Sequence, residues 1–158
     1  MRYYFVQSFN VPRATFSLAE LNNRGDIVGA YKHPNGEEQS FLMDREGRFT
    51  YLDFGTPVAV NDHRQVVSRK ALYEDGHVKE LVPGMNDVFI EGITNSGTVF
   101  GSIGDRNAFY KKETESAPSY IPNLGLSVAT GCSDNGDTIV VGQSENKPFI
   151  FKESSGNP

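Results

Sequence analysis

The segment ITNSGTVFG (Ile93–Gly101) occurs in a closely similar form, LNNRGDIVG, at Leu21–Gly29. Two further segments share its pattern, VNDHRQVVS from Val60 and CSDNGDTIVVG from Cys132. Each starts with a hydrophobic residue, continues with a small polar residue and an Asn or Asp, and then enters an apolar, β-rich run. The segments recur at intervals of roughly 33 to 39 residues, which is a spacing typical of repeat architectures. The sequence therefore predicts a fold built from repeated units.

The chemistry of these segments is that of a tight turn between two strands. An Asn or Asp side chain can bond its own backbone two residues on, and a following glycine supplies the positive φ that closes the turn. Gly25, Gly97 and Gly136 hold that position in three segments, and Arg64 holds it in the other. Each segment therefore predicts a β-hairpin. Arg64 must either adopt a positive φ itself or belong to another kind of turn.

The stretches between these segments add further strands. Ser40–Leu52, Ala71–Leu81 and Ala108–Ile121 each read as an apolar strand, a polar turn and another strand. The corresponding Pro148–Pro158 stretch offers only the first strand, and Arg2–Phe9 is a lone run of strand-forming residues that could supply the missing one. The sequence thus predicts an all-β fold. The expected architecture is a small four-bladed β-propeller with about four strands per blade, closed by the N-terminal strand.

On this interpretation, the whole chain of 158 residues is one domain. The expected boundaries are blades at 10–54, 55–84 and 85–125, a last blade at 126–152 that includes 1–9, and a flexible tail at 153–158.

The pattern SFLMDREGRFTYLDFG (Ser40–Gly55) followed by AVNDHRQVV (Ala59–Val67) resembles the HAF-type repeat of bacterial proteins. Those repeats combine an apolar strand, a turn and an Asn-Asp-x-Gly hairpin. The resemblance extends over most of residues 18–152 and implies a repeat architecture. It implies no particular activity.

Composition and charge narrow the classes of partner. The formal net charge is −5 and no Lys/Arg cluster occurs, which argues against binding to nucleic acid or to an anionic membrane. No stretch has the length of a membrane span, and the N-terminus does not have the features of a signal peptide, so a cytoplasmic location is the default expectation. Cys132 is the single cysteine, which excludes an internal disulfide.

In a propeller, the strand before each turn segment would lie innermost and line a central channel. The residue before the segment is small in three units but is Glu20 in the first. Its carboxylate could bind a ligand in the channel or act as an acid or base if burial raised its pKa. The alternative is a solvated or ion-paired glutamate. Glu91 lies one position earlier in its own unit, and we expect it to point the other way.

The small polar position of each segment forms a second candidate group. Asn22 and Asn61, with Thr94 and Ser133, could present polar atoms to a ligand or could bond the neighbouring backbone and fix the hairpins. His63 and Arg64 differ from their counterparts in the other segments, and such departures can mark a functional site. Glu20 with His63 is the best candidate for an acid/base pair.

Two classes of function remain. The first is a binding module whose channel mouth and loops hold a small molecule, a glycan or a protein, with exposed tyrosines as possible stacking surfaces for sugars. The candidate ligand-binding residues are Glu20, Asn22, Asn61, His63, Arg64 and Glu91. The second is a small enzyme of isomerase, lyase or hydrolase type with its acid/base site at the channel mouth. We expect no metal and no cofactor, and either a monomer or a homodimer.

Overall fold

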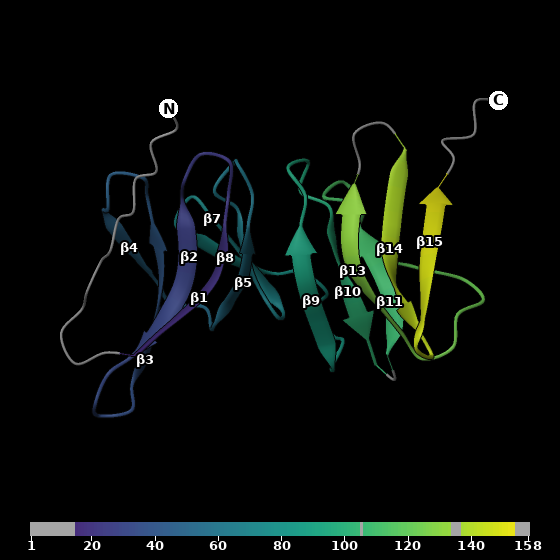
Figure 1. Cartoon of the computed structure of the whole chain (residues 1–158), viewed down its shortest axis with the longest axis horizontal. Coiled ribbons are helices and arrows are strands. Elements are labelled where there is room, and N and C mark those ends of the chain that lie inside the picture. The colour runs from purple at the N-terminus through teal and green to yellow at the C-terminus, as the bar shows by residue number, and fades with distance from the viewer. Residues whose placement is uncertain (1–14, 105, 134–136, 154–158) are drawn as a thin grey trace, which may run out of the picture.

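A computed structural model describes residues 15–104, 106–133 and 137–153 of the chain, and these residues form an all-β structure (Figure 1). The first sheet pairs its strands in chain order, antiparallel throughout. Its strands are β1 (Thr15–Leu21), β2 (Ile27–Lys32), β3 (Glu38–Met43) and β4 (Phe49–Leu52). The second sheet repeats this order with β5 (Pro57–Val60), β6 (Val66–Ser68), β7 (Ala71–Glu74) and β8 (His77–Glu80).

The third and fourth sheets are likewise antiparallel meanders. The third contains β9 (Val88–Ile93), β10 (Val99–Ile103), β11 (Asn107–Lys111) and the short β12 (Ser119–Tyr120). The fourth has three strands among the described residues, β13 (Ser127–Ser133), β14 (Thr138–Ser144) and β15 (Lys147–Glu153). Alternating apolar residues and closely spaced turns give short strands of this kind rather than helices.

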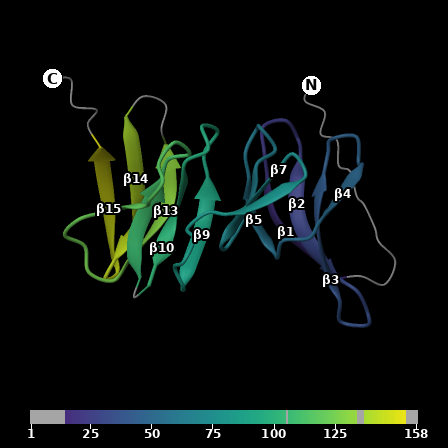
Figure 2. The same cartoon turned by 180° about the vertical axis from the view of Figure 1, so that it is seen from behind.

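The four sheets stand in an open row, so the prediction of a closed four-bladed propeller is wrong. The first and fourth sheets lie at opposite ends of the row in both views (Figures 1 and 2). In the described residues, all the extensive contacts between sheets join sheets that follow one another along the chain. Sheet packs on sheet, which is closer to the arrangement of a β-sandwich than to a ring.

The propeller prediction is wrong because a turn pattern determines local structure only. Turn residues and strand alternation fix the hairpins within a sheet, but the angle between sheets depends on how their side chains interlock. The strand at 1–9 that was expected to complete a ring lies outside the described residues. The tail was expected at 153–158; Glu153 instead ends β15, and residues 154–158 lie outside the described residues.

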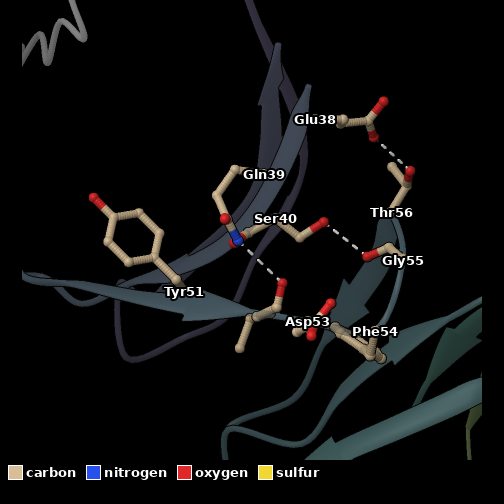
Figure 3. A pocket seen from close by; sticks show the side chains of 9 residues that line it. Glu38, Gln39, Ser40, Tyr51, Asp53, Phe54, Gly55 and Thr56 are labelled. Atoms are coloured by element: carbon tan, nitrogen blue, oxygen red, sulfur yellow. Dashed lines mark hydrogen bonds between the residues drawn. The ribbon is translucent and has the colours of Figure 1, made fainter. Parts of the chain in front are cut away.

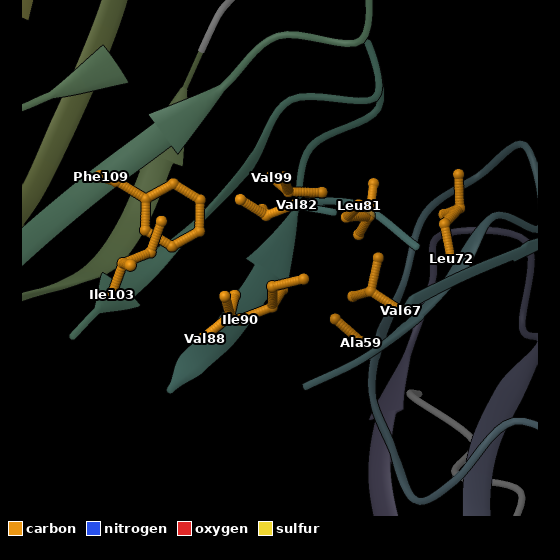
Figure 4. Close-up of a cluster of buried hydrophobic side chains, with 10 residues drawn as sticks. All are labelled: Ala59, Val67, Leu72, Leu81, Val82, Val88, Ile90, Val99, Ile103 and Phe109. Atoms are coloured by element: carbon orange, nitrogen blue, oxygen red, sulfur yellow. The ribbon is translucent and has the colours of Figure 1, made fainter. Parts of the chain in front are cut away.

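Hydrophobic cores fill the spaces between neighbouring sheets. The largest joins the second and third sheets (Figure 4). There Val67 and Leu72 meet Ile90 and Val99, and Phe109 is completely buried behind them. Burying a side chain of this size contributes about 1.5–3 kcal/mol relative to leaving it exposed. Smaller cores join the first sheet to the second and the third to the fourth.

The glycine that ends two of the turn segments has a packing role. The first strand of every sheet carries a register shift where it pairs with the second strand. At this bulge the backbone approaches so closely that a Cβ on Gly101 would collide with the carbonyl oxygen of Phe89. Gly142 stands in the same relation to the carbonyl oxygen of Val128. Only glycine fits such a close backbone approach.

None of the residues that the structure describes forms a helix long and apolar enough to cross a membrane.

Candidate functional site

The turn segments of the first three sheets lie next to one another along the row. We call the turns Asn22–Asp26, Asn61–Gln65 and Thr94–Thr98 the turn edge. In each, the first residue's N–H donates to the carbonyl of the last, over 3.0, 3.1 and 2.9 Å respectively. The fourth position has φ of 83° at Gly25, 62° at Arg64 and 84° at Gly97. Arg64 therefore adopts the positive φ itself. Residues 134–136 of the last segment lie outside the described residues.

The amide of Asn22 holds its own turn and the next sheet together. Its Oδ1 accepts the backbone N–H groups of Arg24, at 3.0 Å, and Asp26, at 2.9 Å. Its Nδ2 donates to the carbonyl oxygen of Asn61, at 2.9 Å, and to the Asp26 carboxylate, at 3.0 Å. The residue is only 6% exposed. All the hydrogen-bonding capacity of this side chain is used inside the protein.

Asn61 repeats the arrangement one sheet further along. Its Oδ1 accepts the N–H groups of His63 and Gln65, both at 3.0 Å. Its Nδ2 donates to the carbonyl oxygen of Thr94, at 3.0 Å, and to Oε1 of Gln65, at 2.6 Å. Asn22 and Asn61 thus have structural partners throughout. Of the two interpretations open from the sequence, these contacts fit the fixing of the hairpins.

Arg64 forms an ion pair across the first two sheets. Its Nη2 and Nε lie 2.9 and 3.1 Å from the two carboxylate oxygens of Asp26, which is 1% exposed. Burial by itself raises the pKa of Asp26. The hydrogen bonds from Arg64 and Asn22, with the nearby guanidinium charges, outweigh it and hold the pKa below its usual value. The departure from glycine at position 64 therefore provides a partner for a buried carboxylate.

Two cavities flank the middle turn of the turn edge. One of about 370 Å³ lies toward the first sheet and gathers guanidinium groups; it is lined by Asn23, Arg24, Asp26, Arg45, Glu46 and Arg64. The other, of about 490 Å³, lies toward the third sheet and is richer in carboxylates; it is lined by His63, Gln65, Glu74, Asp75, Asn95, Ser96 and Glu113. His63 and Arg64, adjacent in sequence, thus line different cavities.

The expected acid/base pair of Glu20 and His63 does not share a cavity. His63 lines the cavity toward the third sheet, and Glu20 does not line that cavity. Glu20 lies near the end of β1. Partial burial of its carboxyl raises its pKa, and a hydrogen bond from the backbone of Val60 opposes that shift. Glu91 lies exposed at the bulge of β9. Because the row of sheets is open, Glu20 has no closed central channel to line.

A third cavity, larger than the two at the turn edge, lies at the free edge of the first sheet (Figure 3). We call it the edge cavity. Its volume is about 560 Å³, and strands β3 and β4 form it together with the loop that leads to β5; it is lined by Glu38, Gln39, Ser40, Tyr51, Leu52, Asp53, Phe54, Gly55 and Thr56. Sequence reasoning missed it because none of its residues belongs to a turn segment.

Tyr51 is the most distinctive residue of the edge cavity. Its side chain belongs to β4 and is 61% exposed, which is unusual for a large aromatic residue on a strand. The ring is supported from behind by Phe49 and Tyr31, each 6.5 Å away between ring centroids. One sequence signal could have pointed to this cavity. Phe49, Tyr51 and Asp53 alternate along the chain, and every second residue of a strand shares a face.

Internal hydrogen bonds shape the floor and rim of the edge cavity. Ser40 Oγ donates to the carbonyl oxygen of Gly55, at 2.7 Å, and Thr56 Oγ1 donates to Glu38, at 2.6 Å. Gln39 Nε2 donates to the carbonyl oxygen of Leu52, at 3.2 Å. These bonds tie the loop to β3 and so fix the cavity wall (Figure 3). The remaining oxygens of Glu38 and Gln39, and the exposed carboxylate of Asp53, face a site of ligand size.

Comparison with known proteins gives no assignment: no described family, curated protein or solved structure matches the chain. Within the described residues, no group of three or more His, Cys, Asp or Glu side chains is placed to hold a metal ion. The candidate site therefore rests on cavity geometry and side-chain chemistry.

Proposed function

We propose that the protein is a binding module that holds a small, hydroxyl-rich ligand of the glycan class in the edge cavity. The observation that carries this proposal is that the exposed ring of Tyr51 and the carboxylates of Glu38 and Asp53 line one cavity. An aromatic face offers a platform for the C–H face of a sugar ring. Carboxylate and amide oxygens accept hydrogen bonds from its hydroxyl groups.

The size and rigidity of the edge cavity support the same function. A volume of about 560 Å³ lies within the range of pockets that bind small ligands. Tyr51 is held by aromatic neighbours and the loop at 53–56 is held by hydrogen bonds, so few groups would have to be ordered when a ligand enters. Such preorganisation lowers the entropic cost of binding.

We further propose that the chain consists of HAF-type repeat units. The four turn segments and the strand pattern of Ser40–Gly55 support this assignment. In this proposal the turn segments are common to the units and serve the architecture. The ligand site lies outside the turn segments, between the first two of them, and the chain works in the cytoplasm as a module without catalytic activity of its own.

A titration of the isotope-labelled chain with cello-, chito- and malto-oligosaccharides, followed by NMR chemical shifts, tests the function. We expect at least one of these probes to shift the backbone signals of residues 38–40 and 51–56. Tyr51→Ala should abolish those shifts. Tyr120→Ala, which removes another exposed tyrosine from a different sheet, is the matched control and should leave them unchanged.

Two results would count against the proposal. One is that none of the oligosaccharides shifts any signal at the edge cavity. The other is that the Tyr51→Ala variant binds as well as the unaltered chain, because the ring would then not be the platform.

A further inference from the structure

The second and third strands of every sheet carry a directly paired set of apolar residues on the face that looks toward the next sheet. The pairs face each other across the two strands at the same place in each sheet; they are Val28 with Leu42, Val67 with Leu72, Phe100 with Tyr110, and Val141 with Ile150. Paired side chains of this type are the unit from which sheet faces are built.

In the first three sheets this pair is buried under the sheet that follows. Val28 and Val67 are 0% exposed, and Phe100 is 8% exposed. Each belongs to a core shared with the next sheet, and Phe100, for example, packs in one cluster with Ala129 and Val140 of the fourth. The face that bears the pair is therefore an established interface, repeated three times along the row.

In the fourth sheet the same pair is open to solvent. Val141 is 38% exposed and Ile150 is 79% exposed, while Val140 between β13 and β15 is fully buried toward the third sheet. Ile139 lies on the same side of β14 as Val141, since alternate residues share a face, and it is 36% exposed. We call the surface formed by Ile139, Val141 and Ile150 the terminal face. A contiguous apolar surface of this kind commonly marks a protein interface.

We propose that the terminal face is a self-association surface, covered by the terminal face of a second copy of this chain. The argument is one of continuity, because the three equivalent faces in the chain are all covered by another sheet. At the other end of the row, the exposed ring of Tyr51 lines the edge cavity, and the apolar residues around it are largely covered. Of these, Tyr31, Phe41 and Met43 are at most 6% exposed.

Among the described residues, the equivalent open surface that a second copy offers is thus its own terminal face. The two faces then meet about a two-fold axis, so that each copy contributes the same residues. Such a contact closes on itself and produces a dimer rather than a growing fibre.

The extent of the terminal face sets the strength of the dimer. Three strands about 4.8 Å apart and seven residues long, at about 3.4 Å per residue, present a flat area of roughly 300 Å². A stable interface usually buries about 800 Å² per partner. We therefore expect a weak dimer with a dissociation constant of about 100 µM, which forms at high protein concentration and separates on dilution.

Sedimentation velocity on the full chain from about 10 µM to about 1 mM, a range that brackets this affinity, tests the proposal. The unaltered chain should shift from monomer to dimer across the range. Ile150→Lys, at a site that is largely exposed and so should not disturb folding, should remain monomeric throughout. Val78→Lys, which changes an exposed apolar residue of β8 in the second sheet, is the matched control and should dimerise as the unaltered chain does.

Three results would overturn the proposal. They are an unaltered chain that stays monomeric up to the highest concentration, an Ile150→Lys variant that dimerises normally, and a series of species larger than a dimer. Thermal melting checks that Ile150→Lys is folded, and Ile150→Thr, which keeps a β-branched residue, replaces it if it is not.

Discussion

The turn edge and the edge cavity differ in where their polar groups are directed. At the turn edge the amides of Asn22 and Asn61 are buried, and every polar atom bonds within the protein. At the edge cavity Tyr51 and Asp53 are exposed and face open space. The residues that recur along the chain therefore hold the sheets together. Groups free to meet a ligand lie outside the turn segments.

The strongest test of this difference between the turn edge and the edge cavity is to remove the amide of Asn61. Asn61→Ala leaves the N–H groups of His63 and Gln65 and the carbonyl of Thr94 without their partner, and both Asn61 and Gln65 are buried. We expect a loss of about 3 kcal/mol in the free energy of unfolding, measured by urea denaturation. Asn95→Ala, in the exposed part of the same edge, should lose less than about 1 kcal/mol. Equal losses in the two variants would show that burial does not matter at this edge.

A smaller loss should follow from removing the partner of a buried charge. Arg64→Ala takes the bidentate guanidinium from Asp26 while keeping a Cβ at the same positive φ. We expect a loss of about 2 kcal/mol, because the carboxylate remains in a site 1% exposed. Arg24→Ala removes a guanidinium that donates to the exposed carbonyl oxygen of Asp62, and it is the matched control with little change. A loss no larger than that of the control would mean that Arg64 is not needed by Asp26.

The same ion pair predicts a dependence on pH. The pKa of Asp26 is lower in the folded than in the unfolded chain, so its stabilising effect is present above about pH 4 and is lost as the pH falls through the folded value. Asp26→Asn should be less stable than the unaltered chain by about 1.5 kcal/mol at pH 7. That difference should shrink as the pH is lowered from 7 to about 2. Denaturation curves that keep a constant gap at every pH would contradict the assignment of the charge.

The smallest effect on stability is expected at the edge cavity. Tyr51→Ala removes an exposed ring that covers little of the core, so the free energy of unfolding should change by less than about 0.5 kcal/mol. Oligosaccharide binding should nevertheless be lost in the same variant. A thermal melt paired with the NMR titration checks both. A variant that loses stability and binding together would place Tyr51 among the structural residues.

The sequence allowed the hairpins to be predicted but not the assembly of the sheets. Asn22 and Arg64 could be placed in turns because side-chain bonding and positive φ are local requirements, and the structure has both. The closing of the sheets into a ring was predicted and is wrong, since the angle between sheets depends on contacts such as that of Phe100 with Val140, which no local pattern encodes.

The candidate site was less predictable than the hairpins. Glu20 and His63 were paired through an assumed channel, and the open row leaves no such channel. The edge cavity gathers Tyr51 of β4, Glu38 at the start of β3 and Thr56 of the following loop around one space. This juxtaposition follows from the register of the sheet edge, with Tyr51 opposite Phe41, and from the path of the loop. Neither can be read from spacing along the chain.

The open row also has a consequence for how the molecule comes apart. Extensive contacts between sheets in the described residues join only successive sheets, so the two inner sheets have two neighbours each and the outer sheets one. In molecules built this way, stability approaches a sum of local and nearest-neighbour terms, and opening starts at the ends. Amide hydrogen exchange should therefore form a gradient, slowest at Val67 and Val99 in the middle of the row and faster toward β4 and β15. The protein would then lose its structure one sheet at a time, from the outside inward.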